Sequence, residues 1–120
     1  MIVGIGVDLI EIARVAAKCQ DQRIRFAEKM FTKRERERAA RQKYTPYQHL
    51  AACFAAREAF YKATQIRYQR NKVSVAQHDS GQPYYVLAPE IEQQLGARRV
   101  HVSLTHDRTH AVAVCVCEEN

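Results

Sequence analysis

Two side chains suited to phosphate chemistry stand one helical turn apart near the middle of the chain. Glu58 and Lys62 belong to the segment AACFAAREAFYKA, residues 51–63. Its periodicity is helical, and an i,i+4 spacing on a helix places both side chains on one face. A carboxylate and an ammonium on one rigid helix are the minimum for holding a metal ion and the phosphates around it. An ordinary surface pair has the same spacing and contributes only a few tenths of a kcal/mol, so the spacing alone leaves both interpretations open.

Two further candidates lie at the ends of predicted strands. Asp8 closes the apolar run IVGIGVD at residues 2–8, where an acidic side chain is costly to bury unless it is paired. Asp8 is therefore a metal ligand, the N-cap of the helix predicted to follow, or both. His106 begins the segment HDRTH, residues 106–110, between two alternating strands. Several ionisable groups in one loop favour a binding site, and a solvated loop histidine is the alternative.

Charge and composition limit the partners and the location of the chain. With 19 Lys and Arg against 13 Asp and Glu, the 120 residues carry a net charge of +6, which favours acidic proteins, phosphorylated ligands or nucleic acid as partners. No apolar run approaches the roughly 20 residues of a membrane span, and the N-terminus lacks the basic region of a signal peptide. The four cysteines follow no zinc-binding spacing. We therefore expect a cytoplasmic protein with reduced thiols.

The candidate residues must be positioned by a small mixed fold. Helical and alternating patterns predict the order β-α-α-α-α-β-β-α-β-β, an α+β fold in one domain of residues 1–120. The long alanine-rich helix should be central and pack against a mainly antiparallel sheet, because small side chains let a neighbouring backbone approach. The two glycines of the first strand allow the same approach. The predicted strands are residues 2–8, 72–75, 84–87, 100–105 and 111–117, and the predicted helices are residues 9–20, about 26–31, 33–43, 47–65 and 89–95.

The first helix is predicted to be amphipathic. Ile10, Ala13 and Ala17 can face inward. Arg14 and Lys18 follow one another at i,i+4 on another face. The helix is thereby expected to present basic side chains to solvent.

The most strongly charged segment is KRERERAARQK at residues 33–43. Thr32 and Glu35 have the spacing of a capping box at its start, and Tyr44-Thr45-Pro46 separates it from the long helix because Pro suits a first helical turn. Its alternating charges indicate a solvated face. Nucleic-acid binding is the alternative, although Glu35 and Glu37 would repel phosphates and no aromatic side chains interrupt the run.

Four segments, in this order along the chain, resemble the motifs of one known family. GVDLIEIARV (6–15), FAAREAFYKA (54–63), the Gly81-Gln82-Pro83 turn and VSLTHDRTHAVAV (102–114) resemble the short phosphopantetheinyl transferases of the holo-acyl-carrier-protein synthase type. The turn matches the family's G-x-P element. The resemblance implies the 4'-phosphopantetheinyl transferase fold. It also implies an enzyme that moves 4'-phosphopantetheine from coenzyme A to a serine of apo-acyl carrier protein and releases adenosine 3',5'-bisphosphate.

The resemblance also implies which residues form the site. The family requires Mg²⁺, and its metal-binding carboxylates fall on Asp8 and Glu58. Its helix lysine falls on Lys62, and the histidine of its S-x-S-H motif, S-L-T-H here, falls on His106. The catalytic residues expected on this basis are Glu58, Lys62 and His106. The residues expected to bind coenzyme A are Lys62, Gly81, Pro83, Ser103 and His106.

The chemistry of these side chains agrees with that assignment. Mg²⁺ prefers oxygen ligands and keeps several waters, so one or two carboxylates and the substrate phosphates suffice. We predict that Glu58, directly or through a water on the metal, takes the proton of the carrier serine. Lys62 would stabilise the charge that grows on the departing bisphosphate. His106 would contact the phosphates or that water.

The partners implied by the resemblance use the positive charge of the chain. Acyl carrier proteins are acidic, and the family's docking surface on the first helix is matched by Arg14. Helical spacing suggests that Lys18, Arg23 and Arg25 extend this surface. The family typically forms a homotrimer with coenzyme A in clefts between subunits. No membrane or nucleic-acid partner is expected, and fatty-acid synthesis is the pathway we expect, with polyketide and peptide synthesis left open.

The sequence departs from the family at two places. Cys53 stands where the family often has arginine, and Arg57 stands where lysine is common. The segment 64–68 replaces a glycine-rich loop, which predicts altered geometry near coenzyme A. Arg67 or Arg70 would be the substitutes for the lost charge. A catalytically weak or inactive carrier-binding member of the family is therefore the alternative function.

Overall fold

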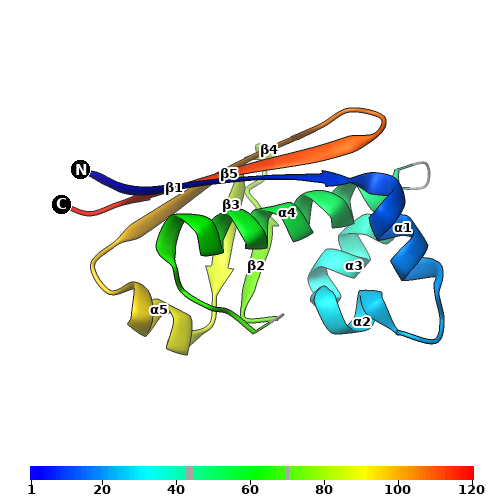
Figure 1. Cartoon of the computed structure of the whole chain (residues 1–120), viewed down its shortest axis with the longest axis horizontal. Helices are drawn as coiled ribbons and strands as arrows, with labels where there is room; N and C mark the ends of the chain where they lie inside the picture. The colour runs from blue at the N-terminus through cyan, green and yellow to red at the C-terminus, as the bar shows by residue number, and fades with distance from the viewer. Residues whose placement is uncertain (43–44, 70) are drawn as a thin grey trace.

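The computed structural model describes residues 1–42, 45–69 and 71–120. Its elements follow the predicted order (Figure 1). Lys43 and Tyr44, at the predicted helix boundary, and Arg70, a predicted substitute charge, lie outside the described residues. The elements are β1 (Ile2–Glu11), α1 (Ile12–Gln20), α2 (Phe26–Met30), α3 (Lys33–Ala40), α4 (Pro46–Thr64), β2 (Val73–Gln77), β3 (Pro83–Leu87), α5 (Pro89–Leu95), β4 (Arg99–His106) and β5 (His110–Glu118).

A three-stranded antiparallel sheet and one long helix form the centre of the molecule. The sheet has the order β1-β5-β4, and α4 lies along one of its faces (Figure 1). β2 and β3 pair in a separate antiparallel hairpin. Helices α1, α2 and α3 gather at one end of α4, and α5 lies at the other end (Figure 1). The predicted α+β fold, with a mainly antiparallel sheet on a long central helix, is confirmed.

The contact between β1 and α4 depends on small residues in both elements. A Cβ atom added to Gly4 would lie 1.9 Å from the carbonyl oxygen of Ala63, and one added to Gly6 would lie 2.0 Å from that of Ala59. Only glycine permits this approach, because real Cβ atoms never come so close to backbone oxygen. The alanines of α4 are buried, as the predicted close packing requires. The contact therefore brings Asp8, two residues beyond Gly6, alongside the next turn of α4.

The predicted boundary between the first strand and the first helix is wrong. β1 continues to Glu11 because Ile10 pairs with Ala111 of β5, and Glu11 pairs with His110. Glu11 occupies the N-cap position of α1 and its side chain makes no capping hydrogen bond, so Asp8 is not a helix cap. The buried side chains of α1 are Ile12 and Val15. Ala13 and Ala17 are exposed, contrary to the prediction.

Helix α3 begins with the predicted capping box but is not fully solvated. Thr32 accepts a hydrogen bond from the backbone of Glu35, and the Glu35 side chain accepts one from the backbone of Thr32. Glu35 is nevertheless only 1% exposed. It forms an ion pair with buried Arg57 of α4, and its Oε2 accepts a hydrogen bond from the backbone of Val75 in β2 at 3.1 Å. One acidic side chain therefore joins α3, α4 and β2.

The cysteines are free thiols, and three of them are buried. Cys115 and Cys117 alternate along β5 on one face of the sheet and belong to the core, as predicted. No helix in the described part of the chain is long and apolar enough to cross a membrane.

Candidate active site

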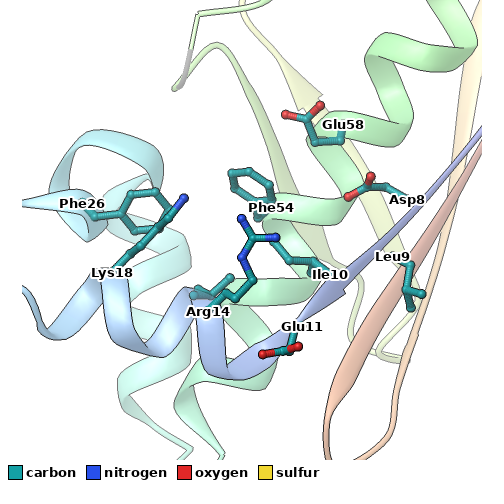
Figure 2. Close-up of a pocket in the computed structure, with 10 residues that line it drawn as sticks. Asp8, Leu9, Ile10, Glu11, Arg14, Lys18, Phe26, Phe54 and Glu58 are labelled. Carbon is teal, nitrogen blue, oxygen red and sulfur yellow. The ribbon is translucent and has the colours of Figure 1, made fainter.

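Two carboxylates that are far apart in the sequence meet in one pocket of about 240 Å³. Asp8 enters it from β1 and Glu58 from α4 (Figure 2). Figure 2 shows both carboxylates at the same side of the pocket, with Glu58 above the ring of Phe54 and Asp8 beside it. The remaining lining residues are Leu9, Ile10, Glu11, Arg14, Val15, Lys18 and Phe26. The structure thus brings the two predicted metal ligands together.

Lys62 joins these carboxylates through Asp8. Its Nζ lies 3.3 Å from Asp8 Oδ1 and donates a hydrogen bond of 2.9 Å to the carbonyl oxygen of Val7. In this ion pair the Lys62 side chain is half-exposed to solvent. Lys62 is therefore held at the strand by two contacts, and its cationic charge lies at the edge of the site. The i,i+4 spacing predicted the shared face with Glu58, whereas the contact with Asp8 depends on the packing of β1 on α4.

Opposite the carboxylates, α1 supplies positive charge. Arg14 and Lys18 line the pocket from α1, as Figure 2 shows. The Nζ of Lys18 lies 5.4 Å from the centre of the Phe26 ring, a favourable cation–π distance. The pocket therefore places two cations and the Phe26 ring across from Asp8 and Glu58, while the Phe54 ring lies on α4 one turn from Glu58. Such a lining suits a ligand that combines anionic groups with an apolar portion.

Tyr68 contacts Glu58, and the sequence did not predict this contact. The Tyr68 hydroxyl donates a hydrogen bond to Glu58 Oε1 at 3.1 Å. Burial, and then the neighbouring negative charge of Glu58, raise the pKa of the Tyr68 hydroxyl. One signal was present in the sequence, because the segment that contains Tyr68 departs from the family pattern. It did not indicate that the ring returns to a residue ten positions earlier.

The other predicted ligand residues lie away from this pocket in the single chain. Ser103 lies in β4, and His106 at its end lines a second pocket with Thr105 and Leu9. His106 pairs with Ala111, the residue that also pairs with Ile10, so the backbones of His106 and Ile10 are two strand spacings apart, roughly 10 Å. The predicted turn residues Gly81 and Pro83 belong to the β2–β3 hairpin, where Gly81 has a φ of 92°.

The predicted basic docking surface is only partly continuous. Arg14 and Lys18 lie together on α1, but α1 ends at Gln20, so the helical spacing used for Arg23 and Arg25 does not apply. Arg23 is paired with Asp21 at 3.0 Å, and Arg25 is paired with Glu28. The positive charge of Arg23 and Arg25 is therefore partly compensated beyond the end of the helix.

The two residues at which α4 differs from the family's motif have their side chains in the interior of the protein. Cys53 and Arg57 are both completely buried. Arg57 Nη1 donates to the carbonyl oxygen of Cys53 at 3.3 Å, its guanidinium pairs with Glu35, and it lies 5.4 Å from the Phe31 ring. Burial raises the pKa of the Cys53 thiol. Arg57 is therefore directed at the core, which explains why it does not replace a cation at a ligand site.

Comparison with known proteins places this fold in a class of transferases. The family model for the 4'-phosphopantetheinyl transferase superfamily matches residues 4–115. Because this match covers most of the 120 residues, the chain belongs to that superfamily.

Relatives of this chain carry a more specific name. The chain is similar to the holo-[acyl-carrier-protein] synthase of Chlamydia trachomatis serovar L2, with 40% identity over 118 residues, 96% of this chain and 98% of the relative. It is 38% identical to that of Clostridium acetobutylicum, over 98% of each chain. Among solved structures, the synthase of Bacillus anthracis in complex with CoA (3',5'-ADP) matches with a TM-score of 0.83 and 30% identity, over 100% of this chain and 99% of that one.

Proposed function

We propose that this chain is a holo-[acyl-carrier-protein] synthase, formed as one transferase domain over residues 1–120. It transfers 4'-phosphopantetheine from coenzyme A to a serine of apo-acyl carrier protein and releases adenosine 3',5'-bisphosphate. The observation that carries the proposal is the meeting of Asp8 and Glu58 in one pocket, beside Lys62, in a chain of this superfamily. The similarity to synthases over nearly their whole length supports the same activity.

The donor set of this pocket fits Mg²⁺. Asp8 and Glu58 offer carboxylate oxygens, the ligands that Mg²⁺ prefers. Within the described residues no three His, Cys, Asp or Glu side chains gather around a point. Two carboxylates are enough, because Mg²⁺ usually keeps several waters and shares its coordination with substrate phosphates. When bound, Mg²⁺ would neutralise phosphate charge and orient the phosphate for in-line attack.

The side chains of the pocket then have distinct tasks. Glu58 accepts the proton of the carrier serine, whose Oγ forms a bond to the β-phosphorus of coenzyme A. The bond from that phosphorus to the oxygen of the leaving 3',5'-bisphosphate breaks, and Lys62 stabilises the negative charge that appears there. Asp8 keeps Lys62 at the edge of the pocket. In the homotrimer that is proposed below, Ser103 and His106 contact the phosphates, and Gly81 and Pro83 shape the path of coenzyme A.

Mass spectrometry of the carrier tests the activity directly. The protein is incubated with coenzyme A, Mg²⁺ and an apo-acyl carrier protein, with an active-site Ser→Ala carrier as control. We expect the apo-carrier, and not its Ser→Ala variant, to gain the mass of the phosphopantetheine arm. A carrier that binds without gaining mass would instead identify an inactive carrier-binding member. A carrier that neither binds nor gains mass would contradict the proposal.

The basic face of α1 is proposed as the docking surface for the acidic carrier. Arg14 and Lys18 line the pocket that the serine must reach, so carrier bound there delivers its serine to Glu58. Exposed charges attract over about a Debye length, which is near 10 Å at 0.1 M salt. Arg23 and Arg25 would add long-range attraction, reduced by their acidic partners.

We expect Arg14→Gln to raise the KM for the carrier about fivefold at low salt, the loss of roughly 1 kcal/mol for one rim charge. Steady-state kinetics at low and high salt provide the measurement, and the difference from wild type should shrink at high salt. Lys72→Gln is the matched control, because it removes one positive charge that pairs with Glu90 at the α5 end of the molecule. An equal effect of both substitutions, or a salt-independent KM, would contradict this surface.

A homotrimer is proposed from the outer face of β1. Ile5, Val7 and Leu9 alternate on the strand, point away from α4, and are 63%, 54% and 62% exposed. An apolar row of this kind is typical of a protein–protein contact. Ser103 and His106 lie on β4, which β5 separates from β1 in the same sheet, and this contact would set them against the pocket of another subunit.

We expect sedimentation equilibrium to give three times the monomer mass. Val7→Lys should lower it towards the monomer, because it places a charge in the middle of the apolar row. Ile24→Lys is the control, since Ile24 is also an exposed apolar residue but lies outside the sheet. A wild-type monomer at assay concentrations would exclude the trimer.

The proposed location of the protein is the cytoplasm. The free thiols support this location, because reducing compartments preserve them.

A further inference from the structure

The loop that follows α4 turns back along this helix and brings Tyr68 into contact with Glu58. α4 stops at Thr64, and Gln65 adopts a left-handed conformation with a φ of 60°, which reverses the chain. Thr64 Oγ1 fixes the reversal, since it donates to the carbonyl oxygen of Phe60 at 2.8 Å and accepts from the backbone of Ile66 at 3.1 Å. Ile66 is buried in the core. The loop is thereby anchored in a path that carries Tyr68 back along the helix.

Tyr68 uses this path to contact Glu58 specifically. Its ring packs against the core, and its hydroxyl donates to Glu58 Oε1 at 3.1 Å. This bond engages one of the two carboxylate oxygens. It fixes the rotation of the carboxylate and leaves the second oxygen for a cation or for a proton from the substrate. Because a carboxylate oxygen can only accept, the Tyr68 hydroxyl is the donor of this bond.

We propose that Tyr68 is a positioning residue that orients Glu58 toward the divalent cation and the serine proton. The inference rests on the proposed function, because it gives Glu58 its role. Groups that orient metal ligands are worth about 10- to 100-fold in metal affinity or activity. Through the hydrogen bond from Tyr68 to Glu58, the loop of residues 65–69 then contributes to the active site. Its departure from the family's glycine-rich pattern brings a side chain that holds the carboxylate.

The test compares two tyrosines that both bond to α4. Tyr68→Phe removes the hydroxyl that contacts Glu58. Tyr85→Phe, the control, removes a hydroxyl that donates to the carbonyl oxygen of Ala56 on the same helix, at 2.7 Å, instead of to Glu58. Mn²⁺ binding is measured on the protein without coenzyme A by electron paramagnetic resonance, together with Tm, kcat and the KM for the carrier.

We expect Tyr68→Phe to weaken Mn²⁺ binding and to lower kcat, each about tenfold, with the KM for the carrier unchanged. Tyr85→Phe should lower Tm and leave Mn²⁺ binding as in wild type. The inference is overturned if Tyr68→Phe binds Mn²⁺ normally, if both variants lose affinity in proportion to Tm, or if wild type binds no Mn²⁺. A wild-type protein that binds Mn²⁺ but modifies no carrier would contradict the proposed function alone, since the two variants can still be compared.

Discussion

Replacing Glu58 with glutamine is expected to lower kcat by about a thousand-fold, within the range that general-base catalysis and charge stabilisation contribute together. The amide keeps the shape of the side chain and can still accept the hydrogen bond from Tyr68. It carries no negative charge for a cation, and it cannot take the serine proton. The substitution therefore removes chemistry while the contacts of α4 persist.

Glu11→Gln provides the control for this result. Glu11 lines the same pocket, but Figure 2 shows its carboxylate pointing away from Glu58 and Asp8. We expect nearly normal activity from Glu11→Gln and an unchanged Tm from both variants, measured by carrier mass spectrometry and thermal unfolding. A fully active Glu58→Gln protein would end the proposed role. A Glu58→Gln protein with a much lower Tm would show that the loss of activity follows from the fold.

Arg57→Met is expected to lower the free energy of unfolding by about 3–5 kcal/mol, the usual cost of leaving one partner of a buried ion pair alone. The carboxylate of Glu35 would keep two backbone donors, from Thr32 and Val75, but would lose its cationic partner in the core. The measurement is urea unfolding monitored by circular dichroism.

The double variant Glu35→Leu, Arg57→Met separates a buried charge from a simple loss of packing. With both charges absent, the core is apolar, and we expect most of the lost stability to return. The recovery should fall short by about 1–3 kcal/mol, because the buried N–H of Val75 and the capping box of α3 both lose the Glu35 carboxylate. An Arg57→Met protein that unfolds like wild type but has a higher KM for coenzyme A would contradict the structural role.

Local patterns were sufficient to predict most of the fold. Pro46 begins α4, Thr32 and Glu35 form the capping box, and the strands around Gly81 pair as a hairpin. Each of these features depends on residues within a few positions of one another, so the sequence displays it. The boundary between β1 and α1 could not be predicted in this way. Residues 9–11 have an apolar pattern that suits a strand or a helix, and pairing with β5 decides between the two.

The sequence by itself determined the types of chemical groups and their order. It placed Glu58 and Lys62 on one helical face, and the glycines of β1 and the alanines of α4 indicated close packing. Only the tertiary structure decided which groups meet. Lys62 pairs with Asp8 across 54 positions, Arg57 with Glu35 across 22, and Tyr68 bonds to Glu58 across ten. These contacts arise where β1 and α3 pack against α4 and where the chain reverses at Gln65, and no local periodicity specifies any of these events.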